Sequence, residues 1–381
     1  PLSFIAGNMI ININILLLIL STFIIFGKNV FKINFYFLDK LIFLFFFLVL
    51  LTALVNDYYF FTINLYWKGY FTTVVKSLFY LKYLLLFIVI RFLVEKENIN
   101  LKFFFLFASF ASLFVCFDIF IQFFRGEDIF GYLPSGRKLG GPFGDELIAG
   151  GFIQRFSIFA FFLIPLFFSK WNSFLKYIIP ILLITFIIGI ILSGNRMHLV
   201  LFLLIIFLIV LFQKQTRKYF FPFIVIFSLS FLIIFNSNKT VKSNFLDFYG
   251  QTSYMVMLLI NLNLDDNKTP QYIKEFSSFH ETWLLNKYIG GGIKNFRYYC
   301  HVRPNVDKTK KFICNMHPHN YYLEILTETG LIGFIVLGTI FIIALYISLY
   351  KKYFINTPLR FNNFIIPFIF LFIAEIFPLK S

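Results

Sequence analysis

The chain has 381 residues, of which 59% are hydrophobic and 61 are phenylalanine. This composition excludes an ordinary soluble domain and indicates an integral membrane protein. The formal net charge is +16, but asparagine, lysine, isoleucine, phenylalanine and tyrosine are abundant together, as an AT-rich genome would produce, so we expect no nucleic-acid partner.

Apolar segments of about 20 residues follow one another along the chain and predict an all-α polytopic membrane protein. We expect about ten transmembrane helices. Because the chain begins without Met and stops within an apolar segment, we also expect a fragment that lacks its C-terminal end. The predicted segments are 9–26, 41–55, 71–94, 102–124, 152–169, 176–193, 197–212, 219–236, 331–350 and 363 to the end.

Positive charges alternate along the connections and predict their side of the membrane. Five connections rich in Lys and Arg are assigned to the cytoplasm by the positive-inside rule. A segment longer than about 60 residues crosses largely regardless of its charge. The connections assigned to the outer side are 56–70, 125–151, 193–196 and a large loop at 237–319. The chain thus divides into transmembrane helices at 1–236, a large periplasmic loop at 237–319, and further transmembrane helices at 320–381.

Two lysines, Lys76 and Lys82, fall within the predicted helix at 71–94. We interpret them as side chains that reach the membrane surface or line a cavity, and assign them no role.

The stretch RKLGGPFGDELIAGGFIQRF, residues 137–156, opens a predicted helix on the outer side. Its glycines permit close backbone approach, and Asp145 and Glu146 suit the first turn of a helix. Arg155 would lie below the outer surface, where an arginine needs an anionic partner or a water-filled cavity. We treat Arg137 and Arg155 as candidate substrate-binding residues.

The stretch LSGNRMHLV, residues 191–199, is a short turn between two apolar helices. Arg196 would stand at the start of the second helix, where free backbone N–H groups and the helix dipole also favour anions. Such a site suits a lipid diphosphate at the bilayer surface. The alternative is an arginine that reaches up to lipid headgroups.

The stretch FHETWLLNKYIGGGIKNFRYYC, residues 279–300, lies in the predicted periplasmic loop. It combines His280, a triple-glycine turn and Arg297. The alternative is that this stretch forms only a surface subdomain without a chemical role.

Two cysteines, Cys300 and Cys314, both lie in this predicted outer loop, where an oxidising environment allows a disulfide. Zinc is the competing interpretation, because His301, His317 and His319 are nearby in sequence. The spacing matches none of the usual structural zinc patterns, so we favour the disulfide and predict no metal site.

The stretch HPHNYYLEILTETG, residues 317–330, places polar residues at the start of an apolar segment. Polar side chains at membrane depth are energetically costly and are usually functional. From Asn320, the spacing of Glu324 and Glu328 puts all three on one helix face. A histidine at the head of this helix is placed to take a proton from a hydroxyl near neutral pH. The alternative is a solvated helix cap with interfacial tyrosines.

In their order and spacing, these stretches resemble the O-antigen ligase and polymerase superfamily of bacterial membrane glycosyltransferases. The resemblance runs from about Arg137 to Gly338. It implies an inverting, metal-independent transfer of a glycan, without a cofactor, from an undecaprenyl diphosphate carrier to an acceptor hydroxyl at the periplasmic face. His319, directly before Asn320, matches the proposed general base of the family, and Arg196 matches a diphosphate-binding arginine.

Family members often have a second functional arginine shortly before the glycine-rich turn. Here that region reads FSSFHETW, with His280 near the expected place, so Arg297 or Arg303 would have to substitute. The other residues that we predict to bind substrate are Arg155, Arg137, Asn320, His317 and Glu324. For Glu324, which would orient the histidine or a sugar hydroxyl, the alternative is a hydrogen-bonded carboxylate on the helix face.

The leading hypothesis is an O-antigen ligase of the bacterial inner membrane that transfers a polysaccharide to lipid A core. An O-antigen polymerase or a protein O-glycosyltransferase of the same superfamily is the nearest alternative, since these enzymes share one kind of site. The expected partners are a lipid-linked glycan, lipid A core or a glycan acceptor, and the bilayer. A transporter of lipid-linked sugars would carry charged residues in the middle of its helices, whereas here polar residues gather at the outer ends.

Overall fold

The computed structural model describes the chain apart from several short stretches. Within the described part the regular secondary structure is helical, apart from an isolated β-bridge between Ser135 and Lys138. The residues that it leaves out are 63–70, 137, 168–171, 214–219, 238, 240, 244, 248, 251–252, 254–270, 303–313, 315–319, 356–361 and 379–381.

Each predicted apolar segment forms a helix. The α-helices are α1 (Leu2–Ile5), α2 (Asn8–Phe26), α3 (Phe37–Thr62), α4 (Thr72–Glu95), α5 (Leu101–Arg125), α6 (Ala149–Phe156), α7 (Ile158–Phe167), α8 (Asn172–Leu192), α9 (Arg196–Phe212), α10 (Phe220–Ser237), α12 (Gln271–Leu285), α13 (Phe296–Val302), α14 (Tyr321–Leu345), α15 (Lys351–Tyr353) and α16 (Asn362–Glu375). Short 3₁₀ turns lie at Gly27–Phe31 and Gly141–Phe143, and a π-helical turn lies at Tyr346–Tyr350.

Within the described residues, five helical segments are long and apolar enough to cross a membrane: Asn8–Phe31, Phe37–Tyr58, Thr72–Glu95, Leu101–Arg125 and Tyr321–Tyr353. The other predicted spans appear as shorter apolar helices, and the segment 152–169 is divided into α6 and α7 around Ser157. The protein is therefore an all-α, multi-pass membrane protein, whereas the number of ten crossings stays a prediction.

The chain forms two compact units, and each is described by itself. Unit 1 consists of Pro1–Asn14, Ile99–Gly250 and Leu349–Phe377; unit 2 consists of Ile15–Asn98, Gln251–Ser348 and Pro378–Ser381.

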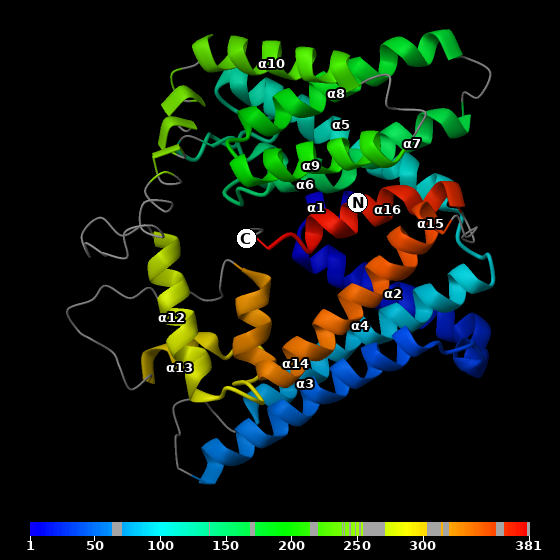
Figure 1. Ribbon diagram of the computed structural model, residues 1–381, viewed down its shortest axis with the longest axis vertical. Helices are drawn as coiled ribbons and strands as arrows, with labels where there is room; N and C mark the ends of the chain where they lie inside the picture. The colour runs from blue at the N-terminus through cyan, green and yellow to red at the C-terminus, as the bar shows by residue number, and fades with distance from the viewer. Residues whose placement is uncertain are drawn as a thin grey trace. The chain divides into compact units, whose positions relative to one another are not determined.

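In unit 1, α5 packs against α6, α7 and α8, and α9 packs against α6, α8 and α16 (Figure 1). The core between these helices is apolar and rich in phenylalanine. Its largest fully buried side chains include Phe105, Phe159, Phe186, Phe202 and Phe370.

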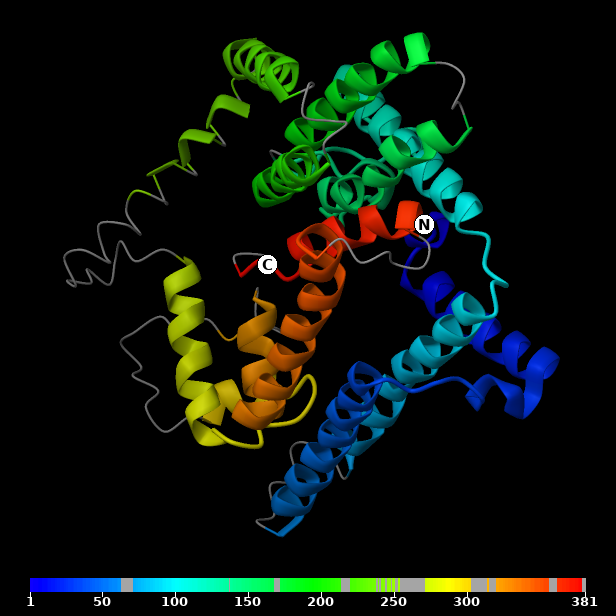
Figure 2. The ribbon, with the colours of Figure 1, turned by 45° about the vertical axis from the view of Figure 1, so that its right-hand side comes forward.

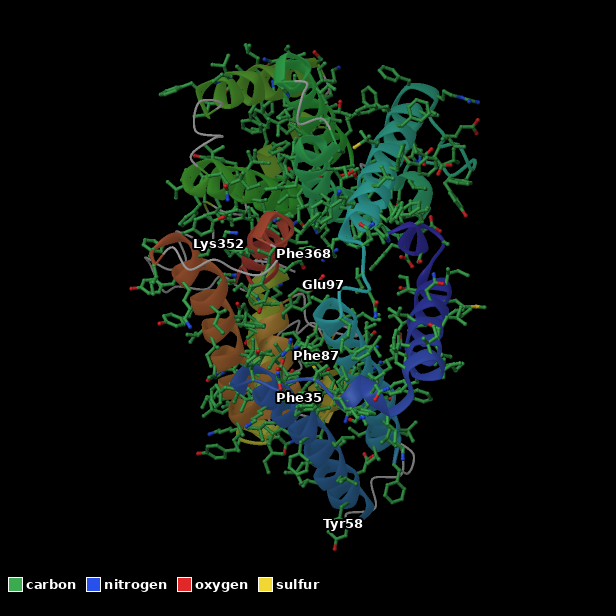
Figure 3. All side chains as sticks on the ribbon, turned by 90° about the vertical axis from the view of Figure 1, so that its right-hand side faces the viewer. Phe35, Tyr58, Phe87, Glu97, Lys352 and Phe368 are labelled. Atoms are coloured by element: carbon green, nitrogen blue, oxygen red, sulfur yellow. A yellow bond between two sulfur atoms is a disulfide. The ribbon has the colours of Figure 1, made fainter. Side chains whose placement is uncertain are left out.

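In unit 2, α3 lies beside α4 and α14, while α12 and α13 pack against the first half of α14 (Figures 1 and 2). The outer faces of its long helices carry apolar side chains such as Phe79, which is 71% exposed, as expected for surfaces that contact lipid. Tyr58 lies at one end of α3, with its side chain pointing away from the helix (Figure 3).

The two ends of the α3–α4 pair carry different polar contacts. At one end, Arg91 Nη2 of α4 lies 3.0 Å from Asp39 Oδ2 of α3. At the other end, Asp57 Oδ2 accepts the backbone N–H groups of Thr73 (2.9 Å) and Val74 (2.8 Å) and thereby caps the start of α4. Polar contacts thus join α3 and α4 at both ends of the pair.

Candidate functional site

The turn between α8 and α9 in unit 1 positions Arg196 as the first residue of α9. The Asn195 amide is oriented so that both its nitrogen and its oxygen have hydrogen-bond partners. In this orientation Nδ2 donates to the Leu147 carbonyl (3.2 Å). The amide oxygen then accepts the Gly150 N–H (3.2 Å) and the Ser193 hydroxyl (3.3 Å). Two stretches that the sequence singled out separately, the SGNR turn and the start of α6, therefore form one structure.

Two glycines of α6 permit this contact. A Cβ atom on Gly150 would lie 2.5 Å from Ser193 Oγ and 2.6 Å from Asn195 Cβ, and one on Gly151 would lie 2.7 Å from His198 Nε2. A side chain at either position would push the turn away from α6. The AGG sequence is thus required by the packing of the turn that carries Arg196.

Arg196 lines a small cavity whose other walls are mostly apolar. A cationic group at a helix N-terminus, next to an apolar wall, combines affinity for an anion with affinity for hydrocarbon. The cavity is lined by Ile190, Ile191, Gly194, Asn195, Arg196, Leu199, Val241 and Phe245.

Arg155, also in unit 1, has an anionic partner. Its Nε lies 3.1 Å from Oε1 of Glu375 on α16, and both side chains are about one-third exposed, at 35% and 30%. We expected this arginine to need an anionic partner or a water-filled cavity, and Glu375 provides the partner from a segment far along the chain.

In unit 2, α14 begins directly after Asn320, which is its N-cap. The Asn320 side-chain oxygen accepts the N–H groups of Tyr322 (3.0 Å) and Leu323 (3.2 Å), and this is the usual role of asparagine at a helix start. His319 is the residue immediately before this cap.

The helix α14 is interrupted at Gly330, which adopts φ 65° and ψ −169°. The turn at Gly290–Gly292 fills the interruption, since the N–H groups of Gly291 and Gly292 donate to the carbonyls of Thr327 (2.8 Å) and Glu328 (2.9 Å). In the other direction, the N–H groups of Leu331 and Ile332 donate to the carbonyls of Lys287 (2.9 Å) and Tyr288 (3.2 Å). This turn provides hydrogen-bond partners for backbone groups that the interrupted helix would otherwise leave unpaired.

Asn56 of α3 and Asn295, which directly precedes α13, hold the glycine turn in place. Asn56 Nδ2 donates to the Gly290 carbonyl (2.9 Å), and its amide oxygen accepts the Tyr299 hydroxyl (2.6 Å). Asn295 Nδ2 donates to the Gly291 carbonyl (2.7 Å) and to Thr73 Oγ1 (2.9 Å). Asn56 and Asn295 are both buried, and we expect these bonds to rigidify the turn.

The acidic face of α14 meets the residues after the glycine turn. Glu328 Oε1 accepts the backbone N–H of Lys294 at 2.6 Å, and Lys294 has a positive φ of 54°. Glu324, one helical turn earlier, is half-buried and lies close enough to Glu328 for the two charges to repel each other. Glu324 and Glu328 thus lie one turn apart on α14, whereas Asn320, predicted on the same face, is the N-cap with an extended backbone.

Cys300 and Cys314 are joined by a disulfide, with a Cα–Cα distance of 5.8 Å. Cys300 is fully buried beside Phe279 and Phe296, whose rings stack at 3.9 Å, and Leu323 of α14 packs on the same cluster. The disulfide therefore ties the chain that leads into His317 and His319 to a packed part of unit 2.

Several predicted residues lie outside the described part of the chain, namely His317, His319, Arg137 and Arg303. His280 is exposed, with its ring 5.8 Å from that of Trp283, and Arg297 is half-buried on α13. Within the described residues, no three His, Cys, Asp or Glu side chains are grouped as a metal site would require.

Sequence reasoning missed Asn56, Asn295, Tyr299 and Glu375. A polar residue near the end of an apolar helix is a sequence signal that could have pointed to Asn56. Its partners, however, come from segments more than 200 residues away. No local pattern identifies such pairs.

Residues 181–338 match the family model described as O-antigen ligase. The chain carries an O-antigen ligase domain. This domain includes Arg196, the glycine turn and Asn320, and it supports a membrane enzyme of the ligase or polymerase type. A search of curated proteins found no match, and neither did a search of solved structures.

Proposed function

We propose that this protein is a glycosyltransferase of the bacterial inner membrane that moves a polysaccharide from an undecaprenyl diphosphate carrier to an acceptor hydroxyl at the periplasmic face. The acceptor that we favour is lipid A core, which makes the protein an O-antigen ligase. One observation carries the proposal: the O-antigen ligase domain contains both helix starts, the one at Arg196 and the one at Asn320.

In this reaction His319 is the general base. It removes the acceptor proton while the hydroxyl oxygen attacks the anomeric carbon of the glycan, opposite the leaving group, so the configuration inverts. A positioned base of this kind contributes roughly a hundred- to ten-thousandfold in rate. Asn320 fixes the start of α14 next to the base, and Glu324 is placed on the same helix to orient the base or a sugar hydroxyl.

The diphosphate leaves with the electron pair of the broken carbon–oxygen bond. Arg196 and the dipole at the start of α9 stabilise the negative charge that develops on it, a role that needs no metal ion. Leu199, Val241 and Phe245, in the cavity next to Arg196, provide an apolar surface for the first isoprene units of the carrier. Arg155 reaches a substrate anion only if it leaves Glu375.

The test is a transfer assay with the purified protein in lipid nanodiscs, a defined undecaprenyl diphosphate glycan, and one of two acceptors. Glycan on lipid A core is the expected product. Growth of the glycan on its lipid carrier would show a polymerase, and transfer to neither acceptor would contradict the proposal.

A further inference from the structure

The loop that follows α5 in unit 1 folds back along the helix that it leaves. α5 ends at Arg125, and Gly126 reverses the chain with a positive φ of 82°. Asp118 Oδ1 then accepts the backbone N–H of Ile129 at 2.8 Å. Because Asp118 lies seven residues before the end of α5, this bond holds the loop tip (residues 128–133) about 10 Å below that end.

This position is at membrane depth. α5 has 25 residues and is one of the segments long and apolar enough to cross a membrane. Such a helix is about 37 Å long and the hydrocarbon core is about 30 Å thick, so each end of a centred α5 extends beyond the core by only about 4 Å. The ring of Phe130 lies beside a still deeper residue, 6.5 Å from the ring of Phe114. We therefore expect the loop tip at the boundary between headgroups and acyl chains.

The side chains of the loop tip have the opposite arrangement to those of a loop in water. Its carboxylate, Asp128, is buried, and so is Asp118 on the facing side of α5. The apolar side chains are exposed instead: Ile129 by 47%, Phe130 by 58% and Leu133 by 70%. A surrounding of lipid favours this arrangement, because polar groups at membrane depth face the protein interior.

The backbone of the loop tip also suits an apolar surrounding, because its N–H groups from Asp128 to Tyr132 all have acceptors. Asp128 Oδ1 accepts those of Phe130 (2.9 Å) and Tyr132 (2.6 Å). That of Ile129 donates to α5, as described above. The N–H of Asp128 donates to the Tyr132 carbonyl (3.1 Å), and that of Gly131 donates to the Asp128 carbonyl (3.2 Å). An unpaired N–H at this depth would cost several kcal/mol, and these bonds avoid that cost.

The exposed side chains of the loop tip border the lipid-facing surface of α5. Phe110, Phe117 and Phe124 are exposed and recur every seven residues, so they form one stripe along the helix. Phe114, whose ring meets that of Phe130, lies four residues after the first of them and three before the second. Residues at these spacings are neighbours on a helix surface. The apolar surface is therefore continuous from the helix to the loop tip.

We propose that the loop tip inserts into the leaflet that surrounds this end of α5, the outer one by the charge rule, with Ile129, Phe130 and Leu133 in contact with lipid. The charged residues at the end of α5 mark the water side, since Arg125 Nη2 lies 3.5 Å from Glu127 Oε1 and both side chains are exposed. The inference concerns contact with lipid alone and is independent of the transfer reaction.

Nitroxide accessibility tests this placement in the full chain in nanodiscs. Leu133→Cys, Phe117→Cys and Glu127→Cys are each labelled in a Cys116→Ala background. Collisions of the label with oxygen, which concentrates in lipid, are compared with collisions with a water-soluble nickel complex. We expect the Leu133 label to match the Phe117 label on the helix stripe, with an oxygen-to-nickel ratio several-fold above that of the Glu127 label, the control from the same loop.

Two results would overturn the proposal. If the Leu133 label meets the nickel complex as readily as the Glu127 label does, the loop tip lies in water, where a glycan can reach it. If the label is shielded from both reagents, a protein partner or a second copy of the chain covers the loop tip.

The anchor of the loop is tested in the Leu133→Cys protein. Asp118→Leu removes the acceptor of the Ile129 N–H, whereas Asp118→Asn keeps an oxygen there. We expect the first change to move the label toward water and the second to leave it in lipid. Thermal unfolding identifies any variant that has lost its fold. An unchanged ratio in folded Asp118→Leu would overturn the anchoring that the proposal assigns to Asp118.

Discussion

Glycine serves two different purposes at the two turns of the O-antigen ligase domain. In unit 1, Gly150 and Gly151 of α6 make room for side chains, those of Ser193, Asn195 and His198. In unit 2, by contrast, Gly290 and Gly330 make room for backbone, because added Cβ atoms there would overlap main-chain atoms of the opposite segment. The Ser193 hydroxyl and the His198 ring can rotate away from a new methyl group, whereas a hydrogen-bonded backbone cannot, so the contact between Gly290 and Gly330 should tolerate less change.

The largest effect is expected from Gly330→Ala. The residue has a positive φ of 65°, and its new methyl group would overlap the Tyr288 carbonyl. We predict a loss of about 3 kcal/mol or more in the free energy of unfolding, together with loss of activity, measured by thermal unfolding in nanodiscs and by glycan transfer.

Gly338→Ala is the matched control, because it lies in the same helix and a Cβ there meets nothing within 4 Å. Equal stability of the two variants would show that the interruption of α14 is not fixed by the glycine turn.

Removal of the Cys300–Cys314 disulfide should have the second-largest effect on stability. The cysteines are 14 residues apart, and a closed loop of this length contributes about 3 kcal/mol through the unfolded chain. We predict that Cys300→Ser with Cys314→Ser lowers the unfolding midpoint, and that dithiothreitol lowers the midpoint of the wild type but not that of the double variant. A midpoint that responds equally to dithiothreitol in both proteins would refute this.

A smaller effect is expected from Gly150→Ala in unit 1. Overpacking of this kind costs roughly 1–3 kcal/mol, and here the methyl group meets side-chain atoms of Ser193 and Asn195. We predict a modest loss of stability but a clear loss of transfer activity, since the displaced turn carries Arg196. Ser193→Ala in the same chain should recover part of the activity. A stability loss as large as that of Gly330→Ala would break the proposed contrast between the two turns.

The smallest effect is expected from the Arg155–Glu375 pair. Both side chains are about one-third exposed, so we expect a coupling of about 1 kcal/mol or less in a double-mutant cycle of thermal unfolding. Activity should respond alike to Arg155→Ala and Glu375→Ala if the pair is structural. A much greater loss with Arg155→Ala alone would instead favour its predicted role in substrate binding.

The helices were predictable from the sequence because long apolar segments in a membrane can satisfy their backbone only as helices. The start of α14 at Asn320 was equally predictable, since a local cap determines it. The seating of Gly290–Gly292 against α14 was not, because it depends on hydrogen bonds between distant segments. The surroundings of Lys76 were unpredictable for the same reason, since its neighbours Asn295 and Tyr298 come from far along the chain.

The most direct test of the enzyme proposal is the rate of glycan transfer from undecaprenyl diphosphate to lipid A core in the wild type and three variants. His319→Ala removes the proposed base, Arg196→Ala removes the proposed diphosphate contact, and His301→Ala is the control, an exposed residue of α13. We predict a loss of about a hundredfold or more for the first two and an unchanged rate for the control. Full activity of His319→Ala would contradict the account.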